Sequence, residues 1–245
     1  MSKILANSLI CDLFIRSYWK DLDWLQFCLA SVERYCRGFR EVIVVVPQST
    51  EPWLRRRLLQ STTRIEFCHD YRDDYLGQQV TKLFADTFTD ADYICHVDSD
   101  CVFSRPTTPL DLVEKGRPRV LIEPCALLGR HRPWQQPTEK FIGYPVFDDF
   151  MRQPPFTFPR RLYKEVRQYA VARHGVDIEA YVTGQPPRSF SEFNVLGAFA
   201  WQYCHGDFLW IDISVSEPTE PHCRWYWSWG GLDKAVRREI KAILA

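Results

Sequence analysis

The sequence predicts an α/β protein with an open, mostly parallel β-sheet flanked by helices. From residue 9 to residue 97, apolar β-rich segments alternate with segments whose apolar residues recur at helical spacing. The segment 41–47 is a continuous β-branched run, which is typical of a strand buried on both faces of a parallel sheet. Because ligands of such sheets bind beyond the carboxyl ends of the strands, we expect the functional site at that edge.

The N-terminal half contains regularly alternating elements. Strands are expected at 9–15, 41–47, 64–68 and 91–97, and helices at 21–35, 52–59 and 76–88. Gly38 follows the first helix and Pro52 lies near the start of the second, where glycine and proline are favoured. This strand–helix series favours parallel strands joined by helical crossovers.

The C-terminal half is less regular. We expect strands at 119–122 and 208–211, and helices at 159–174, 191–204 and 232–244. The stretch 123–159 is proline-rich and too long for a plain connector, so we expect a functional loop or an irregular layer over the site. We therefore divide a single domain into a first half, 1–104, and a second half, 105–245.

The composition narrows the function classes. The chain has 245 residues, 31 Lys plus Arg and 31 Asp plus Glu, so its formal net charge is zero. That balance argues against a protein whose main role is to coat nucleic acid or an acidic membrane. No segment approaches the ~18 consecutive apolar residues of a spanning helix, and we see no signal-peptide pattern. The nine scattered cysteines include no CxxC pair, which predicts reduced thiols and a cytoplasmic protein, at most peripheral to a membrane.

The most informative motif is Asp98-Ser99-Asp100, at the end of the fourth expected strand. Side chains two positions apart in an extended backbone point the same way, so both carboxylates can converge on one point. A hard divalent cation such as Mg²⁺ or Mn²⁺ relieves their repulsion, and a diphosphate can complete its coordination. An acidic turn is the alternative interpretation, but the position at the strand end favours a metal site.

With this motif and the strand–helix order before it, residues 8–104 resemble the GT-A glycosyltransferases. Members have a Rossmann-like N-terminal half for a nucleotide-sugar and a more variable half for the acceptor. Asp98-Ser99-Asp100 matches the family's DxD motif, which implies that Asp100 ligates the metal and that Asp98 reaches the metal or the donor ribose. The resemblance implies Mn²⁺ or Mg²⁺ as cofactor, a nucleotide diphosphate sugar as donor and a glycan or other hydroxyl as acceptor.

The resemblance also implies donor-binding residues upstream of the motif. At the end of the first strand they are Arg16, Ser17 and Tyr18. Asp70 follows the third strand, where family members often place an acidic residue near the base. Gln78 and Lys82 lie four apart on one helix face, so Lys82 can meet a phosphate. A solvated surface lysine is an equally good interpretation of Lys82.

In GT-A enzymes that invert the anomeric centre, a carboxylate deprotonates the acceptor hydroxyl, and the resemblance suggests Glu192 for this role. Ser189 and Glu192 also have the spacing of a capping box, which would direct the Glu192 carboxylate to backbone N–H groups. A retaining mechanism becomes more plausible in that case. Asp148 and Asp149, in the long aromatic loop, are the reserve candidates.

The C-terminal segment 220–231 supplies the remaining candidates. Many GT-A enzymes draw a third metal ligand from such a segment, and His222 is placed for it, although a structural histidine is the alternative. Ser228 can contact the diphosphate. Three tryptophans alternate and can stack on a sugar or base from one wall: Trp225, Trp227 and Trp229.

Other functions remain open. The same acidic metal site suits a nucleotidyltransferase or a phosphohydrolase, and the fold also suits a non-catalytic nucleotide-sugar binder. A zinc site from Cys204-His205 and His222-Cys223 is disfavoured, because neighbouring residues in a strand point apart. A basic helix face could bind an anionic acceptor, although a solvated face is favoured: Arg160, Lys164 and Arg167.

Overall fold

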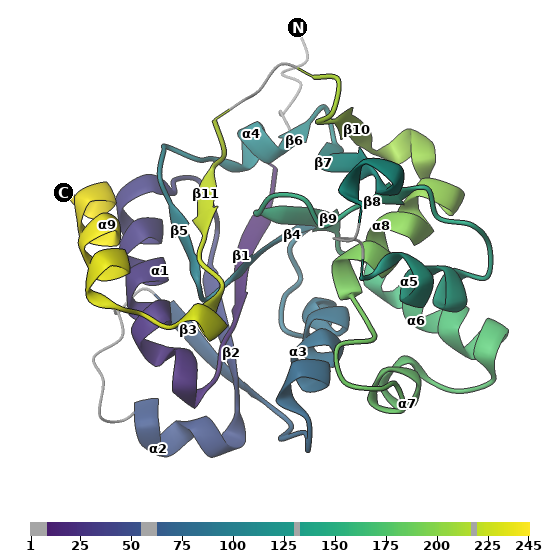
Figure 1. Cartoon of the computed structure of the whole chain (residues 1–245), viewed down its shortest axis with the longest axis horizontal. Coiled ribbons are helices and arrows are strands. Elements are labelled where there is room, and N and C mark those ends of the chain that lie inside the picture. Colours follow the sequence, from purple (N-terminus) through teal and green to yellow (C-terminus); the bar gives the residue numbers. More distant parts are fainter. Residues whose placement is uncertain (1–8, 55–62, 130–132, 217–219) are drawn as a thin grey trace, which may run out of the picture.

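The computed structural model describes residues 9–54, 63–129, 133–216 and 220–245. Its centre is a five-stranded sheet in the order β3-β2-β1-β4-β9 (Figure 1). The first four strands are parallel, and β9 runs antiparallel to β4. The expected α/β class with a mostly parallel sheet flanked by helices is thereby confirmed.

The strands of the central sheet are β1 (Cys11–Arg16), β2 (Val42–Pro47), β3 (Thr63–Cys68), β4 (Tyr93–Asp98) and β9 (Phe156–Pro159). All four strands expected in the N-terminal half are present. Every residue of β1 is buried, and β2 is buried except at its first residue, because helices cover both faces of the sheet.

The helices lie on the two faces of this sheet. On one face are α1 (Leu22–Tyr35) and α9 (Lys234–Leu244), and on the other are α3 (Asp74–Leu83), α6 (Arg161–His174) and α8 (Glu192–Tyr203) (Figure 1). The fully buried Ile240 of α9 clusters with Trp24 of α1. The apolar face of the basic closing helix is therefore used for packing within the protein. Among the described residues, no helix combines the length and apolar character needed to cross a membrane.

The stretch 123–159 is more regular than expected. It contains the helix α5 (Gln135–Ile142), whose Phe141 and Ile142 are fully buried, and it ends in β9. A further helix that the sequence pattern did not predict is α7 (Ile178–Thr183). The second half thus completes the same sheet and core as the first. Of the helix expected at 52–59, the structure describes α2 (Glu51–Leu54), and the rest lies outside the described residues.

Two smaller sheets flank the central one. The first has the order β10 (Leu209–Asp212), β7 (Arg117–Pro124) and β6 (Val113–Glu114), with β8 (Asp148–Asp149) paired to β7 and the short helix α4 (Pro109–Leu112) leading into β6. The second pairs β5 (Cys101–Phe103) with β11 (Cys223–Trp225). This second pairing brings the tryptophan-rich C-terminal segment beside Asp98-Ser99-Asp100. All nine cysteines are free thiols.

Candidate functional site

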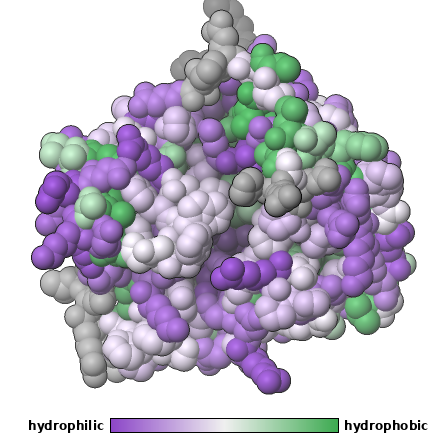
Figure 2. Space-filling view, in the orientation of Figure 1, coloured by the Kyte–Doolittle hydropathy of each residue, from purple (hydrophilic) through white to green (hydrophobic). Residues whose placement is uncertain are grey.

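A pocket of about 400 Å³ lies at the carboxyl ends of β1 and β4. The space-filling view, in the orientation of Figure 1, shows a hollow near the middle of the molecule, with hydrophilic residues in and around it (Figure 2). Its ionisable lining is rich in acids. The carboxylates are Asp21, Asp74, Asp98, Asp100 and Glu192, and the cations are Arg16, Lys82 and Arg188. With all of them charged the lining is negative, which suits a cationic ligand or cofactor.

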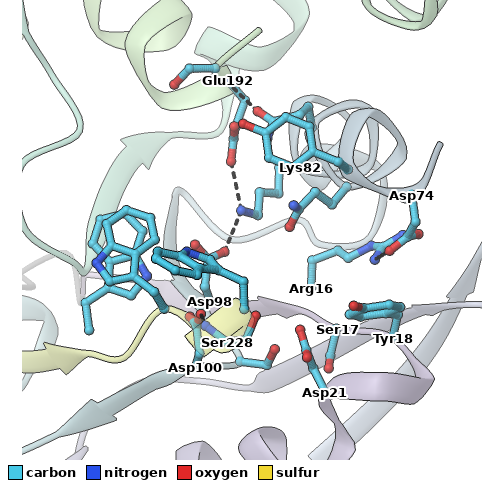
Figure 3. A pocket seen from close by; sticks show the side chains of 18 of the residues that line it. Arg16, Ser17, Tyr18, Asp21, Asp74, Lys82, Asp98, Asp100, Glu192 and Ser228 are labelled. Carbon is cyan, nitrogen blue, oxygen red and sulfur yellow. Dashed lines mark hydrogen bonds and ion pairs between the residues drawn. The ribbon is translucent and has the colours of Figure 1, made fainter. Parts of the chain in front are cut away.

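Lys82 is the centre of a buried ionic bridge. It is only 2% exposed, and its Nζ donates to Asp98 and, at 2.8 Å, to Oε1 of Glu192 (Figure 3). Burial alone would lower the pKa of Lys82, but the two carboxylates together raise it. Lys82 is therefore a fixed internal cation that joins the end of β4 to the start of α8.

Glu192 is held by contacts other than a capping box with Ser189. The N-cap of α8 is Ser191, whose hydroxyl accepts from the N–H of Asn194. The Glu192 N–H donates to Oε1 of Gln79 at 2.9 Å, and its carboxylate faces Lys82 and the pocket. The capping-box interpretation of Ser189 and Glu192 is thus wrong. Burial raises the pKa of Glu192, and the charge of Lys82 opposes that rise.

Asp100 has one satisfied and one unsatisfied carboxylate oxygen. Its Oδ2 accepts from the backbone N–H of Ser228 at 2.7 Å. Its Oδ1 is buried and has no hydrogen-bond partner in the described part of the chain. Burial and repulsion from Asp98 raise the pKa of Asp100 to about 7. A buried carboxylate oxygen without a partner carries a free-energy cost that a bound cation can remove.

The acidic pair fits a divalent cation in its chemistry. Asp98 and Asp100 offer the hard oxygen ligands that Mg²⁺ and Mn²⁺ prefer. In the described ranges, no set of three or more His, Cys, Asp or Glu side chains is arranged to hold a metal ion. Two carboxylates plus oxygens from a substrate and from water are the coordination expected where a cation binds together with a phosphate group.

Asp21 is a third carboxylate near this pair, on the short 3-10 helix (Trp19–Asp21) that follows β1 (Figure 3). Burial raises the pKa of Asp21 to about 6, and the neighbouring Asp74 and Asp98 add to the rise. Asp21 is not among the site residues that the sequence predicts. Its position three residues after Tyr18, on the same exit from the first strand, is the signal that identifies it.

Arg16 ends β1 and forms a two-pronged ion pair with Asp74 of α3 (Figure 3). Its Nη1 donates to Oδ2 of Asp74 at 2.8 Å and its Nη2 to Oδ1. Because Asp74 neutralises it, Arg16 offers little net charge to a ligand. Its Nε and the hydroxyl of Ser17 are buried without partners in the described part of the chain. Both residues line the pocket, so each brings a buried polar group without a protein partner to its wall.

Aromatic side chains contribute to the pocket lining. Trp225 and Trp227 stack with ring centroids 4.5 Å apart and 19° between their planes. Trp229 is 79% exposed, which leaves its ring free to contact a ligand. The backbone N–H of Tyr226 donates to the carbonyl of Asp100 at 2.9 Å, so this tryptophan segment is tied to the acidic motif.

Most of the sequence-predicted residues line this one pocket. They are Arg16, Ser17, Tyr18, Gln78, Lys82, Asp98, Asp100, Glu192, Ser228 and Trp229. The reserve candidates Asp148 and Asp149 are not among the lining residues. Asp149 accepts from the N–H of Met151 at 2.9 Å and lies 3.6 Å from Arg152. Its contacts support a local turn.

Two further predicted residues, Asp70 and His222, also lie outside the pocket. Asp70 accepts from the backbone N–H of Ser49 at 3.2 Å and from its hydroxyl, so it joins the exits of β3 and β2. His222 uses both ring nitrogens, Nδ1 at 2.8 Å from the hydroxyl of Thr107 and Nε2 at 3.1 Å from Arg105. Burial and Arg105 lower the pKa of His222 to about 4. The structure therefore does not bring His222 to Asp98 and Asp100 as a third ligand.

The structure also brings residues to the pocket that the sequence analysis did not single out. They are Asp21, Asp74, Tyr75, Trp134, Met151 and Arg188. Asp74 and Tyr75 lie one turn before the predicted Gln78 on α3, a spacing that could have identified them. Trp134 and Arg188 come from connecting segments without a periodic pattern, and no local signal marks them.

Comparison with known proteins adds no assignment to this geometry. No protein-family model matches the chain, and no curated protein matches it in sequence.

Proposed function

We propose that this protein is a metal-dependent glycosyltransferase of the GT-A type, which moves a sugar from a nucleotide diphosphate sugar to an acceptor hydroxyl. The single observation that carries the proposal is Oδ1 of Asp100, buried without a partner in the described part of the chain. It lies beside Asp98 at the carboxyl edge of a mostly parallel sheet, where ligands of such sheets bind.

Asp98 and Asp100 would hold Mn²⁺ or Mg²⁺, which neutralises the developing charge on the leaving nucleoside diphosphate. The protein's own residues prepare the site for it. The N–H of Ser228 fixes Oδ2 of Asp100, which leaves Oδ1 for the cation. Lys82 fixes the Asp98 carboxylate by a direct hydrogen bond. The free Nε of Arg16 and hydroxyl of Ser17 are donors for the nucleotide-sugar.

Glu192 is the proposed general base. Its carboxylate lines the pocket, and burial raises its pKa, which makes it a better proton acceptor than an exposed glutamate. Lys82 holds Oε1 at 2.8 Å and so fixes the orientation of the group. Removal of the acceptor proton by Glu192 as the hydroxyl attacks gives inversion at the anomeric carbon.

A binding screen tests the proposal. Melting temperature is measured with a panel of nucleotide-sugars, each with and without Mn²⁺. We expect one donor to stabilise the protein only when Mn²⁺ is present, by about 2.7 kcal/mol at 100 times its dissociation constant. Asp100→Ala should abolish this effect, and Asp92→Ala, an exposed aspartate outside the pocket, should retain it. Metal-independent stabilisation, or none by any donor, would contradict the proposal.

The alternative functions are separated by two further results. Glu192→Gln keeps the size and polarity of the side chain but cannot accept the proton, so donor binding should persist while release of nucleoside diphosphate falls about 10²–10⁴-fold. Unchanged release would remove Glu192 as the base. Metal-dependent cleavage of simple phosphoesters with no response to nucleotide-sugars would favour a phosphohydrolase, and donor binding without turnover would favour a binding protein.

A further inference from the structure

The three cations that line the pocket differ in how their charge is used. Arg16 is neutralised by Asp74, and Lys82 by Asp98 and Glu192. Arg188 is exposed and has no ion pair or hydrogen bond with a carboxylate in the described ranges. Of the described pocket residues, Arg188 is therefore the cation whose charge is available to a ligand.

The backbone of Arg188 supports a functional role. Its φ is 58°, in the left-handed region that residues other than glycine adopt only at an energetic cost. Such positions are enriched at ligand sites, where the surrounding structure holds them in place. Arg188 lies in the connection between α7 and α8, three residues before the N-cap Ser191 and four before Glu192.

An aromatic pair lines the same pocket as this arginine. Tyr75 of α3 and Trp134, which precedes α5, stack with ring centroids 6.2 Å apart and 19° between their planes. Both rings are half-buried and line the pocket. Burial raises the pKa of the Tyr75 hydroxyl, Glu192 adds to the rise, and the charges of Lys82 and Arg188 oppose it. Three separate parts of the chain thus bring two flat rings and one guanidinium to the same pocket.

We infer that Tyr75, Trp134 and Arg188 form a subsite for an acceptor saccharide that carries an anionic group, a carboxylate or a phosphate. Flat aromatic faces suit the apolar face of a sugar ring, and polar edges of Tyr and Trp can hydrogen-bond its hydroxyls. The planar fork of arginine binds a carboxylate or a phosphate through two parallel hydrogen bonds.

The position of Arg188 assigns this subsite to the acceptor. The partnerless donors proposed for the nucleotide-sugar, on Arg16 and Ser17, come from the exit of β1, and the acidic pair proposed for the cation follows β4. Arg188, by contrast, belongs to the segment that leads directly into Glu192. The inference rests on the proposed function, because only there does Glu192 take its proton from an acceptor. An anionic group on the acceptor would then fix the sugar ring relative to the reacting hydroxyl.

Ligand-observed NMR with three probes tests the inference in the presence of diamagnetic Mg²⁺ and a nucleoside diphosphate, UDP. The probes are methyl glucuronide, glucose 6-phosphate and the neutral methyl glucoside. We expect at least one anionic probe to bind about tenfold more tightly than the neutral one, as a charge-assisted contact provides. The tighter of the two anionic probes identifies the group as carboxylate or phosphate.

Substitutions test whether Arg188 causes the preference for anionic probes and whether Trp134 contributes to the binding of all three. Arg188→Ala should remove the preference and leave binding of methyl glucoside unchanged, and Arg188→Lys should keep part of it. Trp134→Ala should weaken all three probes. Arg238→Ala is the matched control, because Arg238 is also an exposed arginine but lies on α9, outside the pocket. Melting temperature should not change in Arg188→Ala, since the side chain is exposed and no ion pair is lost.

Three outcomes would overturn the inference. They are equal binding of all probes to the wild type, a preference that survives in Arg188→Ala, or weaker binding of UDP and Mg²⁺ in Arg188→Ala with the probes unaffected. The last outcome would assign Arg188 to the donor. Failure of the proposed function is separate, because probe binding needs no transfer. If the nucleotide-sugar screen fails while the anion preference depends on Arg188, the subsite stands and the transfer reaction does not.

Discussion

Two buried carboxylates near opposite ends of β1 are treated differently by the fold. Near the amino end, Asp12 is fully buried and accepts from Nε and Nη2 of Arg40 at 3.0 and 2.6 Å, from the hydroxyl of Thr89 and from the N–H of Glu41 at 3.1 Å. At the opposite edge of the sheet, beyond the carboxyl end of the neighbouring β4, Asp100 is also buried, but only one of its oxygens has a partner in the described part of the chain.

This difference separates a structural carboxylate from a candidate ligand. Burial removes both carboxylates from water, which costs free energy, but only for Asp12 do hydrogen bonds within the protein offset that cost. Burial and Asp98 raise the pKa of Asp100, which shows that protein contacts do not offset the free-energy cost of burying its charge. Burial of a carboxylate alone therefore says little about function. A buried carboxylate oxygen that lacks a hydrogen-bond partner and lies beside a pocket, however, indicates a group that binds a ligand.

The largest expected effect comes from removing the cation that holds the acidic cluster together. Lys82→Met should destabilise the protein by about 4 kcal/mol, because it leaves Asp98 and Glu192 without their buried counter-ion. Urea unfolding at pH 7 measures the change. Lys234→Met, at an exposed lysine of α9, should change stability by less than about 0.5 kcal/mol. A loss for Lys82→Met as small as that of the control would show that the bridge does not stabilise the cluster.

The next largest effect concerns Asp12, both of whose carboxylate oxygens accept hydrogen bonds. Asp12→Asn should destabilise the protein by about 2 kcal/mol, because the neutral amide weakens the hydrogen bonds from Arg40 and one of its ends can no longer accept. The same urea experiment applies, with no dependence on added Mn²⁺. A neutral or stabilising effect would mean that Asp12 is not compensated by its partners.

The smallest effect should have the opposite sign. Asp100→Asn should stabilise the metal-free protein by about 1 kcal/mol at pH 8, because it removes an uncompensated buried charge. The folded-state pKa of Asp100, about 7, is raised above the ordinary aspartate value of 3.8, so the stability contributed by its protonated form is lost as pH rises through this interval. The gap between variant and wild type should therefore open between about pH 4 and pH 7.

Melting temperatures of both proteins in EDTA across this pH range measure the gap. A constant difference at every pH would mean that the Asp100 carboxyl titrates normally. A destabilised Asp100→Asn at pH 8 would place Asp100 in the same structural class as Asp12.

The fold and one rim of the pocket could be predicted because they depend on local patterns. The β-branched run at 42–47 and the apolar run before Asp98 identify buried strands from composition alone. Once the strands are parallel, their ends must share one edge, and this brings Arg16 and Asp98 together without any knowledge of side-chain contacts.

The remaining parts of the site depend on contacts between segments far apart in the sequence. Nothing local indicates that Thr107 and Arg105 occupy both nitrogens of His222, or that Ser49 holds Asp70. The sequence favours a phosphate contact and a solvated surface position equally for Lys82, and the surface interpretation is wrong, because the residue is buried. Its burial between two acids is set by where α8 packs, which no helical pattern in α3 reveals.

The pairing of β11 with β5 has a consequence for biosynthesis. Asp98 and Asp100 leave the ribosome well before Tyr226 and Ser228, the residues whose N–H groups clasp Asp100. A nascent chain can assemble the parallel strands early, yet its acidic rim stays open until the tryptophan segment arrives. A chain without β11 and the segment after it would leave Oδ2 of Asp100 without its N–H partner, so the acidic rim is completed only once these residues have been made.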